Sequence, residues 1–356
     1  MKNRENVSGL CHFKTLEWVD DGLSLLDQRF LPEEETYFRC DSVEDVIEAI
    51  KMMVVRGAPA IGIAACYGVV LSVIKYSNQQ SNVFEQSVLS DMACLETSRP
   101  TAVNLMWAVD LMRGLFKRSL DDPELKIILL STAKKIHADD IENNQKMGEF
   151  AADIMGDCEK PFSVITHCNA GALATGGYGT ALGAVRSAAD RGLIDLVYAD
   201  ETRPWLQGAR LTAWELEKDQ ISVCLNTDSA AAWLMANRNI KWVIVGADRI
   251  ASNGDVANKI GTYNLAIVAK YHNVKVMVVA PSNTVDMNTL DGEAISIEMR
   301  GEEELKVIKG VNIAPKAVPA INPVFDVTPA ALIDVIVTEL GVVKRPCSDS
   351  MKQLFG

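Results

Sequence analysis

The chain has 356 residues, 48% of them hydrophobic and 23% charged, which is the composition of a globular protein with one large or two ordinary domains. Its formal net charge is −12. This charge argues against nucleic acid or an anionic membrane as the main partner, because both select basic surfaces. A small anionic substrate stays possible, since a few local arginines or lysines suffice to bind one.

The cysteines and the N-terminus bear on the compartment. Eight cysteines occur without any CxxC pair, so we expect no zinc site. The first 13 residues lack the apolar core of a secretory signal, and we therefore expect a cytoplasmic protein with reduced thiols. Cys66 and Cys224 lie in apolar runs, and we expect both to pack in the interior.

The N-terminal part begins with alternating apolar and polar residues at 14–40, which predict a small antiparallel hairpin or meander with an Asp-Asp-Gly turn at 20–22. Ser42 is a good N-cap for a helix that we expect to run to about residue 53. Gly-Ala-Pro at 57–59 breaks this pattern and starts an uncharged run. That run is nearly long enough to span a membrane, but its glycines, proline and polar residues favour a buried core helix.

Two arginines precede predicted helix starts in this part. Arg56 stands before the proline-containing first turn, where free backbone N–H groups can bind a phosphate; the alternative is an ordinary helix–helix turn. Residues 80–155 read as mostly helical, with a break at 98–101. Arg99 lies in this break and is either a second phosphate ligand or a solvated side chain.

We place the domain boundary near residues 121–123 or within the following helix, giving domains 1–125 and 126–356.

From residue 161 onward the chain alternates between strand-like and helical segments. The strand-like runs are 162–166, 194–198, 221–225, 242–245 and 274–279. This alternation predicts a mostly parallel sheet of doubly wound type. Polar residues follow each run, at 167–168, 200–203, 226–228, 248–249 and 281–282. Since a ligand crevice forms at the carboxyl ends of such strands, we expect the functional site there.

Cys168 follows the first of these strands and precedes a glycine-rich loop and a helix. This position favours partial exposure and a tuned thiol, although a simple buried thiol is the alternative. His167 is expected to be structural, because adjacent strand residues point to opposite faces. Asp248 follows another strand and is suited to proton transfer or, alternatively, to capping a helix. Asn258 and Lys259 precede a further helix and either hold a phosphate or are solvated.

A competing interpretation comes from the glycines at 177–183, which, with Asp200 or Glu201 about 20 residues further on, resemble a dinucleotide-binding fingerprint. The loop at 169–175 is too long for the tight first turn of that motif, so we disfavour it. Further on, the acidic segment 286–309 is expected to leave the sheet, and residues 329–340 to form a closing helix that starts at Thr328 and Pro329.

Several short motifs occur together along nearly the whole chain: RGAPAIG at 56–62, HCNAG at 167–171, ETRP at 201–204, QGAR at 207–210, GADR at 246–249, NKIG at 258–261, NP at 322–323 and FDVTP at 325–329. LLDQR at 25–29, with LP at 31–32, fits the same pattern. In this order they resemble the methylthioribose-1-phosphate isomerase family, relatives of the regulatory subunits of translation initiation factor 2B.

This resemblance implies an α/β protein with a smaller helical N-terminal domain carrying a short antiparallel sheet, a Rossmann-like C-terminal domain and a homodimer. It implies conversion of 5-methylthioribose 1-phosphate to 5-methylthioribulose 1-phosphate in methionine salvage, with no metal or nucleotide cofactor. The family's catalytic residues fall on Cys168 and Asp248. Its substrate contacts fall on Arg56, Gly57, Ala58, Arg99, Gln207, Asn258 and Lys259, with no departure at these positions.

The resemblance leaves alternatives open. Cys168 and Asp248 are expected to share the acid and base roles, with Asp248 protonating the ring oxygen; the hydrogen can instead move between carbons as a hydride in an apolar site. A sugar such as 5-deoxyribose 1-phosphate or ribose 1,5-bisphosphate is an alternative substrate, because a methylthio group contributes only about 1–3 kcal/mol in an apolar pocket. A non-catalytic regulatory subunit is the other alternative, and the presence of both catalytic candidates counts against it.

Overall fold

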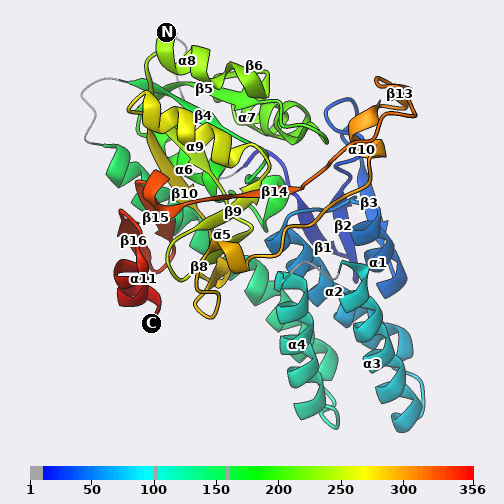
Figure 1. Cartoon of the computed structure of the whole chain (residues 1–356). Coiled ribbons are helices and arrows are strands. Elements are labelled where there is room, and N and C mark those ends of the chain that lie inside the picture. Colours follow the sequence, from blue (N-terminus) through cyan, green and yellow to red (C-terminus); the bar gives the residue numbers. More distant parts are fainter. Residues whose placement is uncertain (1–10, 100–102, 157–160) are drawn as a thin grey trace. The chain divides into compact units, whose positions relative to one another are not determined.

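The structure, a computed structural model, describes residues 11–99, 103–156 and 161–356 (Figure 1). The chain divides into two compact units. The N-terminal unit contains Cys11–Asn143 and Gly171–Gly179, and the C-terminal unit contains Asn144–Ala170 and Thr180–Gly356. The chain therefore passes between the units within α5 (Leu125–Met155) and on either side of the loop Gly171–Gly179. The boundary at residues 125/126 stays a prediction.

The N-terminal unit begins with the predicted antiparallel meander. Its strands β1 (Leu16–Val19), β2 (Gly22–Leu26) and β3 (Tyr37–Cys40) pair in the order β1-β2-β3. Asp20 and Asp21 join β1 to β2 with φ of 47° and 54°. A two-residue turn with both φ values positive follows the right-handed twist of the hairpin, which is why short polar residues occupy it.

Four helices follow the meander: α1 (Val43–Lys51), α2 (Ala58–Tyr76), α3 (Ser81–Ser98) and α4 (Val103–Arg118). Ser42 caps α1 as predicted, because its Oγ accepts the N–H of Asp45 at 3.2 Å while the Asp45 carboxylate accepts the N–H of Ser42 at 2.9 Å. Residues 100 and 101 of the predicted break at 98–101 lie outside the described residues.

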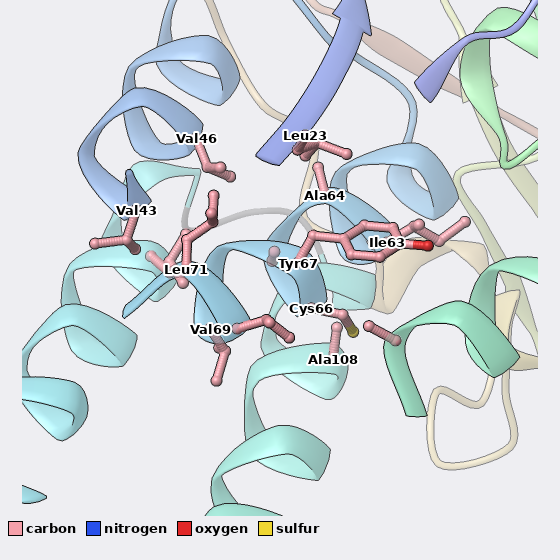
Figure 2. Packing of buried hydrophobic residues seen from close by; sticks show 14 of the residues in the cluster. Leu23, Val43, Val46, Ile63, Ala64, Cys66, Tyr67, Val69, Leu71 and Ala108 are labelled. Atoms are coloured by element: carbon pink, nitrogen blue, oxygen red, sulfur yellow. The ribbon is translucent and has the colours of Figure 1, made fainter. Parts of the chain in front are cut away.

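Helix α2 forms the centre of this unit. Among the described residues it is the one helix long and apolar enough to cross a membrane, but 78% of its most apolar window is buried. Figure 2 shows why: Leu23 of β2, Val43 and Val46 of α1 and Ala108 of α4 pack around it. Cys66 of α2 is fully buried, as predicted. The helix is therefore the buried core helix that the sequence indicated.

The C-terminal unit is built on a seven-stranded sheet with the order β16-β15-β10-β7-β4-β5-β6. All neighbours are parallel except β15 and β16. This confirms the predicted mostly parallel sheet. Its strands are β4 (Phe162–Thr166), β5 (Ile194–Asp200), β6 (Val223–Asn226), β7 (Ile240–Val245), β10 (Lys275–Val279), β15 (Val335–Thr338) and β16 (Gly341–Lys344).

Each face of this sheet contributes to its own apolar core. Trp242 and Ile244 of β7 pack with the end of α5, α6 (Ala181–Asp190) and α7 (Ala213–Lys218). Val243 and Val245 point the other way and pack with α8 (Ala231–Asn237), α9 (Thr262–Tyr271) and α11 (Ser348–Phe355). Burial on both faces explains why these strands read as continuous apolar runs.

A second, four-stranded sheet has the order β11-β8-β9-β14. Its strands are β8 (Arg249–Ala251), β9 (Val256–Lys259), β11 (Val285–Asp286) and β14 (Phe325–Thr328). The acidic segment 286–309, predicted to leave the sheet, contains only short elements: a 3₁₀ turn (Gly292–Ala294), α10 (Glu303–Lys306) and β12 (Val307–Ile308). Strand β12 forms a hairpin with β13 (Val311–Asn312), just beyond the segment.

Two sequence expectations are wrong. The predicted closing helix at 329–340 is instead a 3₁₀ turn, Ala330–Leu332, followed by β15. Asp334 fixes β15 beside β10, since its N–H donates to the Val276 carbonyl and its carboxylate accepts the Val276 N–H. Cys224, expected in the interior, is exposed because β6 is the edge strand of the sheet.

Candidate active site

Cys168 lies immediately beyond β4 in a backbone conformation that is unusual for its residue type. Its φ is +62°, in the left-handed region, and its side chain is half-buried. Its N–H donates to Thr202 Oγ1 at 2.8 Å, and its carbonyl accepts from Thr212 Oγ1 at 2.6 Å. Non-glycine residues with strained backbones cluster at functional sites, so this geometry marks Cys168 as a candidate reactive centre.

His167 is buried beneath this edge and is structural, as expected. Its Nε2–H donates to the Ile260 carbonyl at 2.8 Å, and its Nδ1 lies 2.9 Å from Asp200 Oδ2. Burial alone would lower the pKa of His167, but the hydrogen bond and the charge of Asp200 outweigh it and raise the pKa to about 9. His167 is therefore an imidazolium that joins the ends of β4 and β5 to the turn after β9.

The ends of β4, β5 and β6 meet in one polar cluster, as the strand-end pattern predicted. Asp200 accepts from Asn226 Nδ2 at 2.7 Å in addition to pairing with His167. Asp228 accepts the N–H groups of Thr202 and Arg203 at 2.7 and 2.8 Å. His167, Asp200 and Asp228 are close enough together to hold a metal ion, with ligand atoms within 4.8 Å of one another. However, an imidazolium that donates from both nitrogens has no lone pair for a metal. We therefore interpret this cluster as structural: it links the ends of β4, β5 and β6 by hydrogen bonds.

Asp248 follows β7 and reaches the same end of the parallel sheet. Its N–H donates to the Ala257 carbonyl at 2.9 Å, which fixes its backbone to β9, and its side chain is exposed. An exposed carboxylate at the carboxyl end of a central strand can exchange protons with a bound ligand. The structure thus places Asp248 and Cys168 beyond adjacent strands, since β7 pairs with β4.

Asn258 and Lys259 lie at the end of β9 and are both buried, which excludes the alternative that they are solvated side chains. Asn258 Nδ2 donates to Thr262 Oγ1 at 3.0 Å, and Lys259 Nζ lies 4.9 Å from the centre of the Phe325 ring. The N-terminus of α9 itself is occupied by Asp326, which accepts the N–H groups of residues 261 and 263. These two N–H groups are therefore not available to a phosphate.

Gln207 precedes a five-residue π-helix, Gly208–Thr212, and is only 9% exposed. Its Oε1 is buried and has no hydrogen-bond donor among the described residues. A buried acceptor without a partner costs free energy and invites a ligand donor such as a hydroxyl group.

The other candidates belong to the N-terminal unit. Gly57 is the N-cap of α2 with φ of +90°, and a Cβ there would lie 2.4 Å from the Ala174 carbonyl oxygen. Glycine thus allows the α2 N-terminus to approach the loop Gly171–Gly179 closely. Arg56 and Ala58 flank Gly57 and are half-buried, as is Arg99 at the end of α3.

The same loop is held by side chains to which the sequence analysis assigned no role. Thr15 and Gln28 donate to the Ala172 and Leu173 carbonyls at 2.6 and 2.7 Å. His137 Nε2 donates to the Gly176 carbonyl at 2.8 Å, and the Asp140 carboxylate accepts the N–H of Gly176 at 2.7 Å. These contacts explain why the loop that follows Cys168 folds with the N-terminal unit.

Fold and site together define an α/β protein with polar and thiol side chains at the carboxyl edge of a parallel sheet. The family model of the initiation factor 2 subunit family matches residues 54–345. A methylthioribose-1-phosphate isomerase of Ectopseudomonas mendocina is 53% identical over 353 residues, covering 99% of this chain and 98% of the relative. The one from Nitrosococcus oceani is 51% identical over 343 residues, covering 96% and 98%.

Solved structures agree with these relatives. The crystal structure of 5-methylthioribose 1-phosphate isomerase from Pyrococcus horikoshii matches with a TM-score of 0.92 and 41% identity, covering 100% of this chain and 99% of that one. Subunit delta of the translation initiation factor eIF-2B from A. fulgidus matches with a TM-score of 0.86 and 39% identity, covering 96% and 99%. The chain belongs to the initiation factor 2 subunit family, among the methylthioribose-1-phosphate isomerases.

Proposed function

We propose that this protein isomerises 5-methylthioribose 1-phosphate to 5-methylthioribulose 1-phosphate in methionine salvage. The observation that carries this proposal is identity above 50%, over 96% or more of the chain, to relatives named methylthioribose-1-phosphate isomerase. A thiol and a carboxylate beyond two adjacent parallel strands support it, because the reaction requires groups that donate and accept protons.

The chemistry follows from the substrate. Its first carbon carries the phosphate, so the ring does not open as a free sugar does, and the ring oxygen must gain a proton as its bond to that carbon breaks. The hydrogen of the second carbon then moves to the first, and the hydroxyl of the second carbon loses its proton to become the ketone. We assign to Asp248 the donation of the proton to the ring oxygen. We assign to Cys168 the acid or base role in the step that follows, at the first two carbons.

Two routes for the moving hydrogen are distinguishable. If a base removes it as a proton, solvent exchange introduces deuterium at the first carbon in D₂O. If it moves as a hydride, the product carries no solvent deuterium there. Full deuterium incorporation, read by NMR, would exclude the hydride route.

We propose that the phosphate and sugar are bound by Arg56, Gly57, Ala58, Arg99, Gln207, Asn258 and Lys259. The N-terminus of α2 offers N–H groups to a phosphate, and the neighbouring Arg56 adds a charged, bidentate donor. The buried Gln207 Oε1 supports a hydrogen bond from a sugar hydroxyl. Arg56→Ala is expected to raise KM strongly while the protein stays folded; R191A, which removes a surface arginine paired with Glu149 and Asp153, is the matched control.

We also propose that the protein is a cytoplasmic homodimer. On α9, Tyr263, Ile267 and Tyr271 are 40%, 44% and 82% exposed at four-residue spacing, and this apolar stripe suits a second copy. The cysteines of the described segments are free thiols, which fits a reducing compartment. Analytical ultracentrifugation of the wild type and of Y271E tests the dimer: a monomeric wild type would contradict it.

The test of the function is an assay of purified protein with 5-methylthioribose 1-phosphate, without added cofactor, followed by NMR. We expect conversion to the ketose, and faster conversion than for 5-deoxyribose 1-phosphate or ribose 1,5-bisphosphate. No conversion of the methylthio substrate would contradict the proposal. Faster conversion of either competitor would reassign the substrate.

A further inference from the structure

Cys168 adopts its left-handed conformation although nothing in its own residue type favours it. At a φ of +62° the Cβ of a cysteine lies close to backbone atoms. Without restraint from its surroundings, this residue would adopt a negative φ. The surrounding structure must therefore hold both peptide planes that flank this residue.

Two buried threonine hydroxyls do this. Thr202 Oγ1 accepts the N–H of Cys168 at 2.8 Å and donates its own hydrogen to the Asp200 carbonyl at 2.9 Å. Thr212 Oγ1 donates to the Cys168 carbonyl at 2.6 Å and accepts from Asn169 Nδ2 at 3.2 Å. Both threonines are fully buried. Thr202 holds the N–H of Cys168 and Thr212 holds its carbonyl.

The threonines are themselves fixed by the fold. Thr202 also has a left-handed φ of +65°, and its N–H donates to Asp228 Oδ1 at 2.7 Å. Thr212 ends the π-helix that begins at Gly208, where a Cβ would lie only 1.6 Å from the Asp200 carbonyl oxygen. Glycine thus lets this π-helix approach the end of β5 closely enough to bring Thr212 to Cys168.

We propose that Thr202 and Thr212 are positioning residues that hold Cys168 in its left-handed conformation and so direct its thiol to the substrate. This inference rests on the proposed catalytic role of Cys168. The threonines act through the cysteine backbone: they fix the two peptide planes that determine its φ and ψ, and neither is assigned a contact with the reacting atoms.

The test replaces each hydroxyl by a methyl group of similar size, in T202V and T212V, and restores it in T202S and T212S. Thr338 provides the matched control, since it is equally buried and its hydroxyl also bonds two backbone groups, donating to the Gly341 carbonyl and accepting the Leu340 N–H. For each variant we would measure kcat, KM and the rate of Cys168 alkylation by iodoacetamide from pH 6 to 10, with peptide mass spectrometry identifying the modified residue.

We expect T202V and T212V to lower kcat by about 100-fold, because a displacement of about 1 Å at a reacting group has an effect of this size. KM should change little, the serine variants should recover most of the activity, and the pH profile of Cys168 alkylation should shift in the valine variants alone. T338V should match the wild type. Folded valine variants with unchanged kcat and alkylation profile would overturn the proposal.

If a valine variant does not fold, the same change is made together with C168G. Glycine adopts positive φ without strain, so C168G should restore folding if the threonines act by holding Cys168. Failure of this rescue would overturn the proposal. An unaltered activity of C168S would instead refute the catalytic role of Cys168, whereas the alkylation profiles would still measure the positioning.

Discussion

The buried pair of His167 and Asp200 makes the folding stability of the protein depend on pH above neutrality. The pKa of His167 is about 9 in the folded protein, against 6.5 for an ordinary histidine. Because the folded-state pKa is raised, this stabilisation is fully present below pH 6.5 and is lost as the pH rises through 9. The difference corresponds to about 3 kcal/mol of unfolding free energy for a buried group.

The pKa can be measured directly. The protein has four histidines, so their ring Cε1–H signals can be assigned with single substitutions and followed by NMR from pH 5 to 10. We expect His167 to titrate near pH 9. His137 is an internal reference, because burial lowers its pKa below the ordinary value.

The stability change is measured by urea unfolding at pH 6.5 and 9.5. Between pH 6.5 and 9.5 the free energy of unfolding of the wild type should fall by about 3 kcal/mol more than that of H167Q/D200N, which lacks both titrating groups. For H137Q it should fall by as much as for the wild type. A His167 pKa at or below 6.5, or equal losses in wild type and the double variant, would refute this reasoning.

Three further predictions concern the N-terminal unit. Gly57→Ala should lower the free energy of unfolding by about 1–3 kcal/mol because of its positive φ, and by more because the new Cβ meets Ala174. G192A, at positive φ with nothing within 4 Å of the new Cβ, should lower it less. Equal losses in urea unfolding would argue against the contact with Ala174. Ser42→Ala should cost about 1 kcal/mol by removing the capping box of α1, and an unchanged urea midpoint would contradict this. Asp140→Ala should speed hydrogen exchange in residues 171–179 without affecting β4, so unchanged exchange there would show that the carboxylate does not hold the loop.

The elements that were predictable from sequence are those whose signals are local. The capping box at Ser42, the turn at residues 20–22 and the apolar run of β4 each depend on a few neighbouring residues. The meeting of polar side chains at one sheet edge was predictable as well, because parallel strands place their carboxyl ends together.

The strand β15 was missed because its signal is ambiguous. Apolar residues in 329–340 fit a helical spacing as well as a strand, and only the place beside β10, with Asp334 bonded to Val276, decides between them. The edge position that exposes Cys224 also depends on the whole sheet order rather than on neighbouring residues.

The parts of the site that sequence could not supply are contacts between distant segments. Thr212 is 44 residues from Cys168, and Gln28 is 145 residues from the carbonyl that it binds. Hydroxyl and amide side chains of this kind are common throughout the chain, so no local pattern separates these from the others. Their importance follows from the backbone groups that they satisfy.

The most direct test of the central claim, that Cys168 and Asp248 form the catalytic pair of an isomerase, compares four proteins with 5-methylthioribose 1-phosphate. These are the wild type, C168S, D248N and C224S, which changes an exposed cysteine at the sheet edge. We predict conversion by the wild type and C224S, and loss of kcat in C168S and D248N with their folding intact. Full activity of C168S or D248N would contradict the claim.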